Sequence, residues 1–139
     1  MTLDKLFLSL HVLGALMWIG GLFATAAFID ATVGEPDVAA KGRLLKATRA
    51  AAIVPDAGGT VAIVFGLHWL FKFKLYEAHY MHPKLALVVL VLGIHVYLRR
   101  KVGQLKRGEA IGAPPAFLKP VISLAAFGII LFVVSKWPT

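Results

Sequence analysis

The sequence predicts an all-α integral membrane protein, a bundle of four transmembrane helices. Of its 139 residues, 59% are hydrophobic, and the mean hydropathy is +0.80. Both values are too high for an ordinary soluble domain. A membrane-spanning helix needs about 20 predominantly apolar residues, and the chain contains four such runs. No internal repeat or long linker divides them, so residues 1–139 are expected to form a single domain.

The four spans are expected at residues 6–29, 50–71, 80–98 and 117–135. The first contains no Asp, Glu, Lys or Arg, and it is too long and lacks the basic start of a signal peptide, so we expect it to be retained. Between the first two spans, the basic amphipathic segment 39–50 is expected to lie at the membrane interface. Pro55 is expected to bend or locally unwind the second span.

Basic residues predict the orientation of the spans. The formal charge is +8, but the Lys and Arg residues lie mostly between the apolar runs, which indicates topology and contact with anionic membrane lipid, not nucleic acid. The loops after the first and third spans hold ten of them: Lys41, Arg43, Lys46, Arg49, Arg99, Arg100, Lys101, Lys106, Arg107 and Lys119. The opposite side holds four: Lys5, Lys72, Lys74 and Lys136. The positive-inside rule therefore predicts that both termini lie outside the cytoplasm.

Several kinds of chemistry are excluded by what the sequence lacks. Without cysteine there is no disulfide, thiolate metal site or cysteine nucleophile. No glycine-rich phosphate-binding motif, HExxH motif or Ser/His/Asp arrangement is present. Redox chemistry in this chain would therefore require a bound prosthetic group or a quinone.

Lys84 and His95 are ionisable residues inside the third apolar run, which makes them candidates for a functional site. Their spacing of eleven residues corresponds to about three helical turns, so both side chains share one face, about 16 Å apart. Lys84 is expected to neutralise a carboxylate of a bound group, to pair with an acid, or to extend to the interface. His95 is expected to be a ligand, a proton relay or a partner of Asp56.

A second candidate face lies on the first span, where His11, Gly14, Trp18 and Gly21 are three or four residues apart. An imidazole beside small residues suits a flat, bulky group such as haem. Alternatively, the glycines permit close helix packing and His11 bonds to a neighbour. In the second span, Asp56 is expected to cap backbone broken by Pro55 or to form an ion pair with Arg49 or His95.

Four segments in this order resemble the HemJ family of small membrane protoporphyrinogen IX oxidases. They read LHVLGALMWIGGLF, RLLKATRAAAIVPDAGGTVAIVFGLHWL, MHPKLALVVLVLGIH and ILFVVSKWP, and together they cover most of the chain. The patterns LH-x6-W-x-GG and H-x-KLALV-x6-GxH are the specific part of this likeness, whereas the apolar residues between them are not.

The resemblance implies oxidation of protoporphyrinogen IX to protoporphyrin IX by a self-associating, multi-pass protein of the bacterial inner membrane. It also implies a bound b-type haem and a quinone or respiratory-chain electron acceptor. Position by position, His11 would be the haem ligand, with His82 as a weaker second metal ligand. Gly14 and Trp18 would line the cofactor site, Lys84 would serve both the cofactor and catalysis, and His95 would be catalytic.

The chain departs from the family pattern after Trp18. The family has a proline-arginine pair and then a tyrosine-histidine pair, whereas this chain reads FATAAFIDA. An alternative function is therefore a non-enzymatic b-type haem-binding protein in electron transfer or haem handling. A third is copper handling, because Met17 and Met81 lie near His11 and His82 in the sequence and thioethers bind soft ions.

Overall fold

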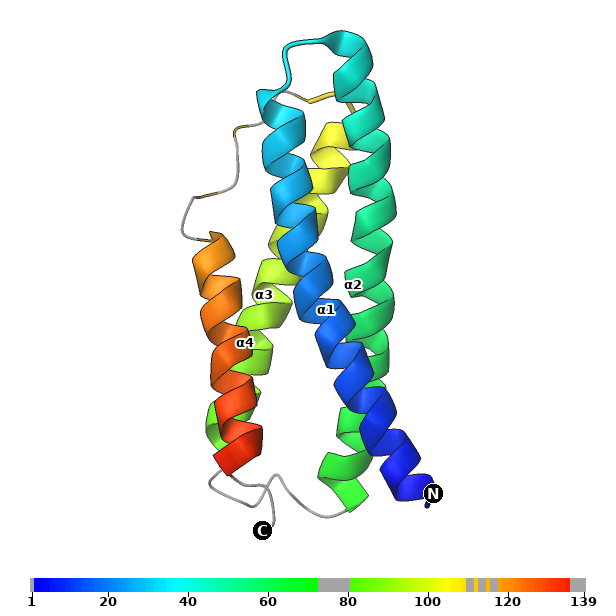
Figure 1. Ribbon diagram of the computed structural model, residues 1–139, viewed down its shortest axis with the longest axis vertical. Coiled ribbons are helices and arrows are strands. Elements are labelled where there is room, and N and C mark those ends of the chain that lie inside the picture. Colours follow the sequence, from blue (N-terminus) through cyan, green and yellow to red (C-terminus); the bar gives the residue numbers. More distant parts are fainter. Residues whose placement is uncertain (1, 73–80, 110–111, 113–114, 116–117, 136–139) are drawn as a thin grey trace.

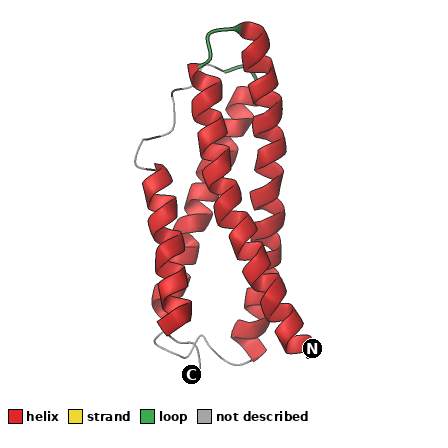
Figure 2. Cartoon of the chain, in the orientation of Figure 1, coloured by secondary structure: helices red, strands yellow, loops and turns green. Residues whose placement is uncertain are grey.

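Four helices form the protein in this computed structural model, which describes residues 2–72, 81–109, 112, 115 and 118–135. They are α1 (Leu3–Gly34), α2 (Val38–Lys72), α3 (Met81–Lys106) and α4 (Leu118–Ser135). Successive helices run in opposite directions, so the start of α1 and the last turn of α4 lie at the same end (Figure 1). Within the described residues every regular element is a helix (Figure 2), and the all-α prediction is confirmed.

The helices α1, α2 and α3 extend beyond the apolar runs from which they were predicted, whereas α4 matches its run. The largest difference is in α2, which already begins at Val38, so the basic segment 39–50 forms its first turns instead of a separate interfacial helix. Backbone hydrogen bonding continues regardless of whether side chains are apolar, so an apolar run marks only part of a helix. The predicted first residues of the third and fourth spans, Tyr80 and Phe117, lie outside the described residues.

Short polar residues mark the ends of the helices. The Thr2 hydroxyl accepts a hydrogen bond from the Lys5 backbone N–H at 3.2 Å, an N-cap for α1. Residues 35–37 connect α1 to α2, and an Asp37 carboxylate oxygen accepts from the Ala40 N–H at 2.9 Å. Gly108, with φ of 77°, ends α3 in the left-handed conformation that favours glycine.

Glycines bring the backbones of α1 and α2 into direct contact. A Cβ atom added to Gly14 would lie 2.6 Å from the Ala62 nitrogen, and one added to Gly58 would lie 2.6 Å from the Trp18 nitrogen. Real side chains do not tolerate such distances, so these positions accept only glycine without movement of a helix. The expectation that glycines on α1 permit close helix packing is confirmed.

Pro55 lies in this same contact. α2 runs through Pro55 without interruption, so the predicted local unwinding is wrong. The Pro55 ring is buried, and its Cδ would lie 2.6 Å from a Cβ added to Gly21, so the absent side chain of Gly21 provides the room for the ring. Because the helix is not broken there, Asp56 caps no freed backbone.

The helices α3 and α4 pack beside α1 and α2 and contribute buried residues to the same core, including Val91 and Leu98 of α3 and Ile122 and Ala125 of α4. Contacts between this pair and α1 or α2 are fewer than those between α1 and α2. In Figure 1 the two pairs lie together near the middle of the bundle and diverge toward the end that holds the start of α1.

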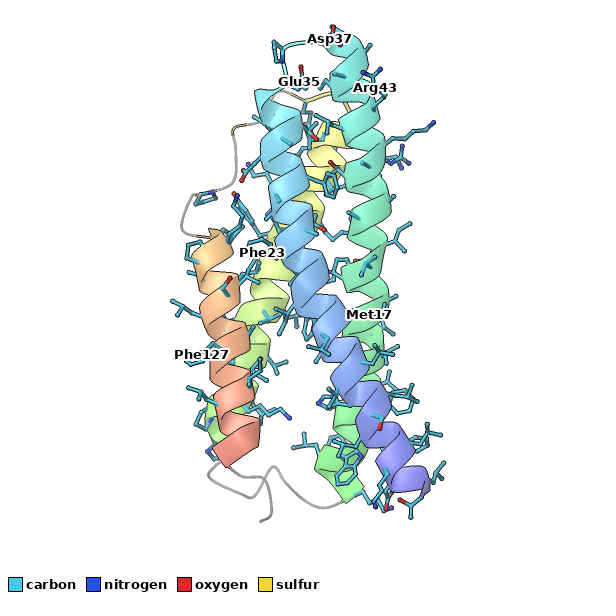
Figure 3. All side chains as sticks on the ribbon, viewed as in Figure 1. Met17, Phe23, Glu35, Asp37, Arg43 and Phe127 are labelled. Atoms are coloured by element: carbon cyan, nitrogen blue, oxygen red, sulfur yellow. The ribbon has the colours of Figure 1, made fainter. Side chains whose placement is uncertain are left out.

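The outer surface of the bundle is apolar on every helix. Phe23 of α1 and Phe127 of α4, labelled in Figure 3, are exposed. The other large exposed apolar residues in the helices include Leu13, Leu16, Ile53, Val64, Leu67, Val89, Leu90, Leu92, Val96, Leu124, Ile130 and Leu131. Among the described residues, α1 and α2 are long and apolar enough to cross a membrane by length and composition alone, and α4 contains the shorter apolar stretch Leu118–Leu131.

Candidate functional site

The predicted site residues fall into two groups along the bundle, one around His11 and one around His95. His11 faces α2 near Ala62 and Gly66, whereas His95 of α3 meets Trp18 of α1 and Asp56 of α2. Because α1 and α2 are antiparallel, the first group lies closer to the end that holds the start of α1. The polar residues therefore form two layers along the bundle.

The His11 ring is held against the backbone of α2. Its Nδ1 lies 2.7 Å from the Ala62 carbonyl oxygen, and its Cε1 would lie 2.9 Å from a Cβ added to Gly66. A carbonyl oxygen only accepts hydrogen bonds, so Nδ1 carries the proton and donates it. In the neutral ring Nε2 then keeps its lone pair, which is the arrangement of a histidine that ligates a metal through Nε2 while its other nitrogen bonds a carbonyl.

Lys84 shares the layer of His11. It is half-buried in the first turn of α3, at the same end of the bundle as His11. His82, two residues earlier, has an exposed side chain. His68 at the end of α2 is also exposed, with its ring edge against Phe7 at a centroid distance of 5.0 Å.

His95 lies in a hydrogen-bonded network that joins three helices. The Trp18 indole N–H donates to His95 Nδ1 at 2.8 Å, and His95 Nε2 lies 2.8 Å from an Asp56 carboxylate oxygen. The other Asp56 oxygen lies 2.7 Å from a guanidinium nitrogen of Arg99. Of the two partners expected for Asp56, His95 is confirmed.

The network determines which His95 nitrogen carries the proton. An indole N–H is a donor only, so Nδ1 must accept, and Nε2 therefore holds the proton and donates it to Asp56. Both ring nitrogens are committed, which leaves no lone pair for a metal. His95 can accept a second proton, or bind a ligand, only after Trp18 moves its N–H away from Nδ1.

The sequence analysis missed Arg99 as a member of this site. Its position one helical turn after His95 is visible in the sequence. It was expected to mark topology or to offer a basic partner to a bound carboxylate, and its pairing with Asp56 was not expected. The ion pair between Asp56 and Arg99 depends on the packing of α2 against α3, which the sequence does not specify.

A cavity of about 410 Å³ adjoins the His95 network. Its walls are mostly apolar and come from α2 and α3, with Ile63, Val64 and Leu92 among them, and Trp18, Asp56 and His95 contribute its polar edge. The Thr60 hydroxyl in the same wall donates to the Asp56 carbonyl oxygen at 2.8 Å.

Two further ion pairs join helices at other levels. Lys72 at the end of α2 lies 2.7 Å from Asp4 at the start of α1. Lys119 of α4 lies 2.9 Å from Asp30 of α1. Between α1 and α2, the buried hydroxyls of Thr32 and Thr48 lie 3.1 Å apart. These contacts tie the helices together outside the histidine sites.

The described part of the chain contains no group of three or more His, Cys, Asp or Glu residues that could hold a metal ion. Among the described histidines, His11 has the bonding that leaves Nε2 available to a metal. One imidazole can ligate a haem iron, because the porphyrin supplies the four equatorial nitrogens.

No family model, curated protein or solved structure matches this chain. The fold and the site thus define a class only: a four-helix protein with two helices able to span a membrane and two polar layers between its helices.

Proposed function

We propose that all four helices span a membrane. α3 and α4 support this through exposed apolar side chains, such as Val89 and Leu92 of α3 and Phe127 and Leu131 of α4, which would face lipid. Charged residues of the α1–α2 connection and of the first turns of α2, with Asp37 and Arg43 labelled in Figure 3, lie at one end of the bundle, where they would meet water.

We further propose that the protein binds a b-type haem through Nε2 of His11 and oxidises protoporphyrinogen IX. The observation that supports haem binding is the hydrogen bond from His11 Nδ1 to the Ala62 carbonyl, which orients the ring and leaves Nε2 for iron. The backbone contact at Gly14 and Gly58 leaves no room for a macrocycle between α1 and α2. The macrocycle would therefore lie toward α3 and α4, and Gly14 serves packing instead of lining the cofactor.

The proposed oxidation requires a place for two carboxylates, a proton acceptor and an electron acceptor. Bound haem would supply the first electron acceptor and pass electrons on to a quinone or respiratory-chain partner. Lys84, half-buried at the same end of the bundle as His11, would bind a propionate of the tetrapyrrole. His95 would accept a proton at Nδ1 when the Trp18 N–H turns away, and Asp56 would stabilise the imidazolium that forms.

The second candidate function is non-enzymatic haem binding. One observation favours it: Trp18 and Asp56 hold both nitrogens of His95, so the proposed base is committed to structural bonds. In this function His11 would still ligate haem, but Lys84 and His95 would take part in no turnover.

The visible spectrum of the detergent-purified protein, oxidised and then reduced with dithionite, tests haem binding. We expect a Soret band and a reduced α-band that are lost in His11→Ala and retained in His68→Ala. His68 is the matched control because it is an imidazole near the same end of the bundle with an exposed side chain. Absence of bound haem after reconstitution with hemin, or equal spectra in both variants, would reject both candidate functions.

Turnover separates the two candidates once haem is established. We expect the purified protein to convert protoporphyrinogen IX to fluorescent protoporphyrin IX above the rate of autoxidation, and to restore growth of a strain lacking its own oxidase. Lys84→Met is expected to abolish turnover and keep the haem spectrum. A haem-loaded wild-type protein without turnover would leave non-enzymatic haem binding as the function.

A further inference from the structure

The surface of α3 beyond His95 contains a basic groove of about 490 Å³. Its lining includes Val96, Arg99, Arg100, Gly103, Gln104 and Arg107. These residues are three or four positions apart, so they follow one side of the helix. His95 lines the inner end of the groove, and Arg99 joins it to Asp56. No residue of the His11 site lines the groove.

The arginines of this groove are only partly neutralised. Arg99 pairs with Asp56 at 2.7 Å and Arg107 with Glu109 at 2.9 Å. In the described part of the chain Arg100 has no ion pair. Three guanidinium groups thus meet two carboxylates, and the groove keeps a net positive charge.

Gly103 opens the middle of the groove. A Cβ atom there would lie 3.4 Å from a guanidinium nitrogen of Arg107, which shows that Arg107 folds back across the helix over this position. Gly108, at φ of 77°, ends the helix and turns the chain so that Glu109 can hold the Arg107 guanidinium. Arg107 is thus oriented by Glu109, although its side chain stays 64% exposed.

We infer that this groove binds the phosphate head group of an anionic phospholipid. A guanidinium presents paired N–H donors that match phosphate oxygens, and Arg100 and Arg107 supply them from opposite sides of Gly103. Val96, at the other end of the groove, is 54% exposed and continues into the lipid-facing apolar side chains of α3, where acyl chains would lie. The groove also lies at the end of the bundle that has the excess of Lys and Arg, which is the end expected to face the anionic leaflet.

This inference rests on the proposal that α3 spans the membrane. It is independent of haem, because the groove lies on the far side of the His95 network from His11. The two proposals can consequently fail separately.

Native mass spectrometry of protein purified in mild detergent and supplied with phosphatidylglycerol or phosphatidylcholine tests the inference. We expect retained phosphatidylglycerol on the wild type, and binding about tenfold weaker in Arg100→Gln/Arg107→Gln. The matched control is Arg43→Gln/Lys46→Gln, which removes the same charge from exposed positions of α2 at the same end of the bundle. The control is expected to bind within about twofold of the wild type.

Equal losses in the two double variants would reject the groove and indicate a general charge effect. Equal retention of phosphatidylcholine, or competition by millimolar inorganic phosphate alone, would also reject a lipid site. Alkaline carbonate extraction and the haem spectrum are read on the same preparations. Extraction of the wild type from membranes would reject the spanning proposal itself, whereas lost lipid selectivity in a membrane-retained, haem-loaded protein would reject the groove alone.

Discussion

The two histidines that face the interior of the bundle, His11 and His95, differ in how their nitrogens are used. His11 commits one nitrogen to the Ala62 carbonyl, whereas His95 commits both, one to Trp18 and one to Asp56. The first is therefore equipped to ligate a metal, and the second is equipped to connect three helices. His11 lies five residues from the start of the first apolar run and His95 three residues from the end of the third, so both are within about a turn and a half of an end.

The comparison shows that the availability of a lone pair, more than the presence of an imidazole, separates a ligand from a structural residue. The two rings also depend on different helix contacts. His11 requires α1 and α2 to approach closely enough for a side chain to reach a backbone carbonyl. His95 requires α3 to stay registered against both of them.

The largest effect is expected from separating α1 and α2, on which both rings depend. Gly14→Leu would place side-chain atoms where the Ala62 nitrogen and Gly58 oxygen now lie, at 2.6 and 2.8 Å from the new Cβ. We expect a loss of roughly 3 kcal/mol or more in the free energy of unfolding. Thermal unfolding in detergent, followed by circular dichroism, measures it.

Gly20→Leu is the control for that experiment, because a Cβ at Gly20 meets nothing within 4 Å. It is expected to unfold within about 0.5 kcal/mol of the wild type. Similar destabilisation by both substitutions would mean that the glycine contact between α1 and α2 is not close.

The next largest effect is expected on haem affinity when each of the two histidines is replaced by alanine. His11→Ala is expected to weaken haem binding more than tenfold, because the axial ligand is removed. His95→Ala is expected to change it less than about threefold, because this ring has no nitrogen free for iron. Titration of the apoprotein with hemin, read at the Soret band, gives both values, and a greater loss in His95→Ala would reverse the assignment.

A smaller effect is expected when the Trp18 hydrogen bond alone is removed. Trp18→Phe keeps an aromatic ring but leaves His95 Nδ1 without its donor, at a cost of about 1–3 kcal/mol in the free energy of unfolding. Combination with His95→Ala provides a double-mutant cycle. We expect Trp18→Phe to cost less in the His95→Ala background, and additive losses would show that the two side chains are not coupled.

The smallest effect is expected at the ion pair between Lys72 and Asp4. The two side chains are 45% and 39% exposed, so solvent screens the pair. Lys72→Gln is expected to lower the free energy of unfolding by less than about 1 kcal/mol. Salt titration of the thermal midpoint checks this, because a much larger loss that persists at high salt would indicate a desolvated pair.

The sequence alone correctly predicted the four helices and the buried face of α1. Four apolar runs correspond to four helices, and the spacing of Gly14, Trp18 and Gly21 predicted the face of α1 that is buried against its neighbours. Both follow from local physics, since helical periodicity and apolar length depend only on residues near one another in the chain.

The ends of the helices and the partners of the polar residues were less accessible. The segment 39–50 became part of α2 because helical hydrogen bonds need no apolar side chains, and Pro55 stayed helical because Gly21 of another helix leaves room for its ring. Spacing within α3 placed Lys84 and His95 on one face, but it gave no information about which groups from other helices would meet them.

Those partners depend on contacts between residues far apart in the chain. Trp18 and His95 are separated by 77 positions, and Asp56 and His95 by 39, so no local pattern records that they meet. The sequence by itself determined that imidazoles lie on apolar helices. Only the tertiary structure decided that His11 keeps a free nitrogen and His95 does not, because hydrogen bonds extend about 3 Å and depend on how the helices pack.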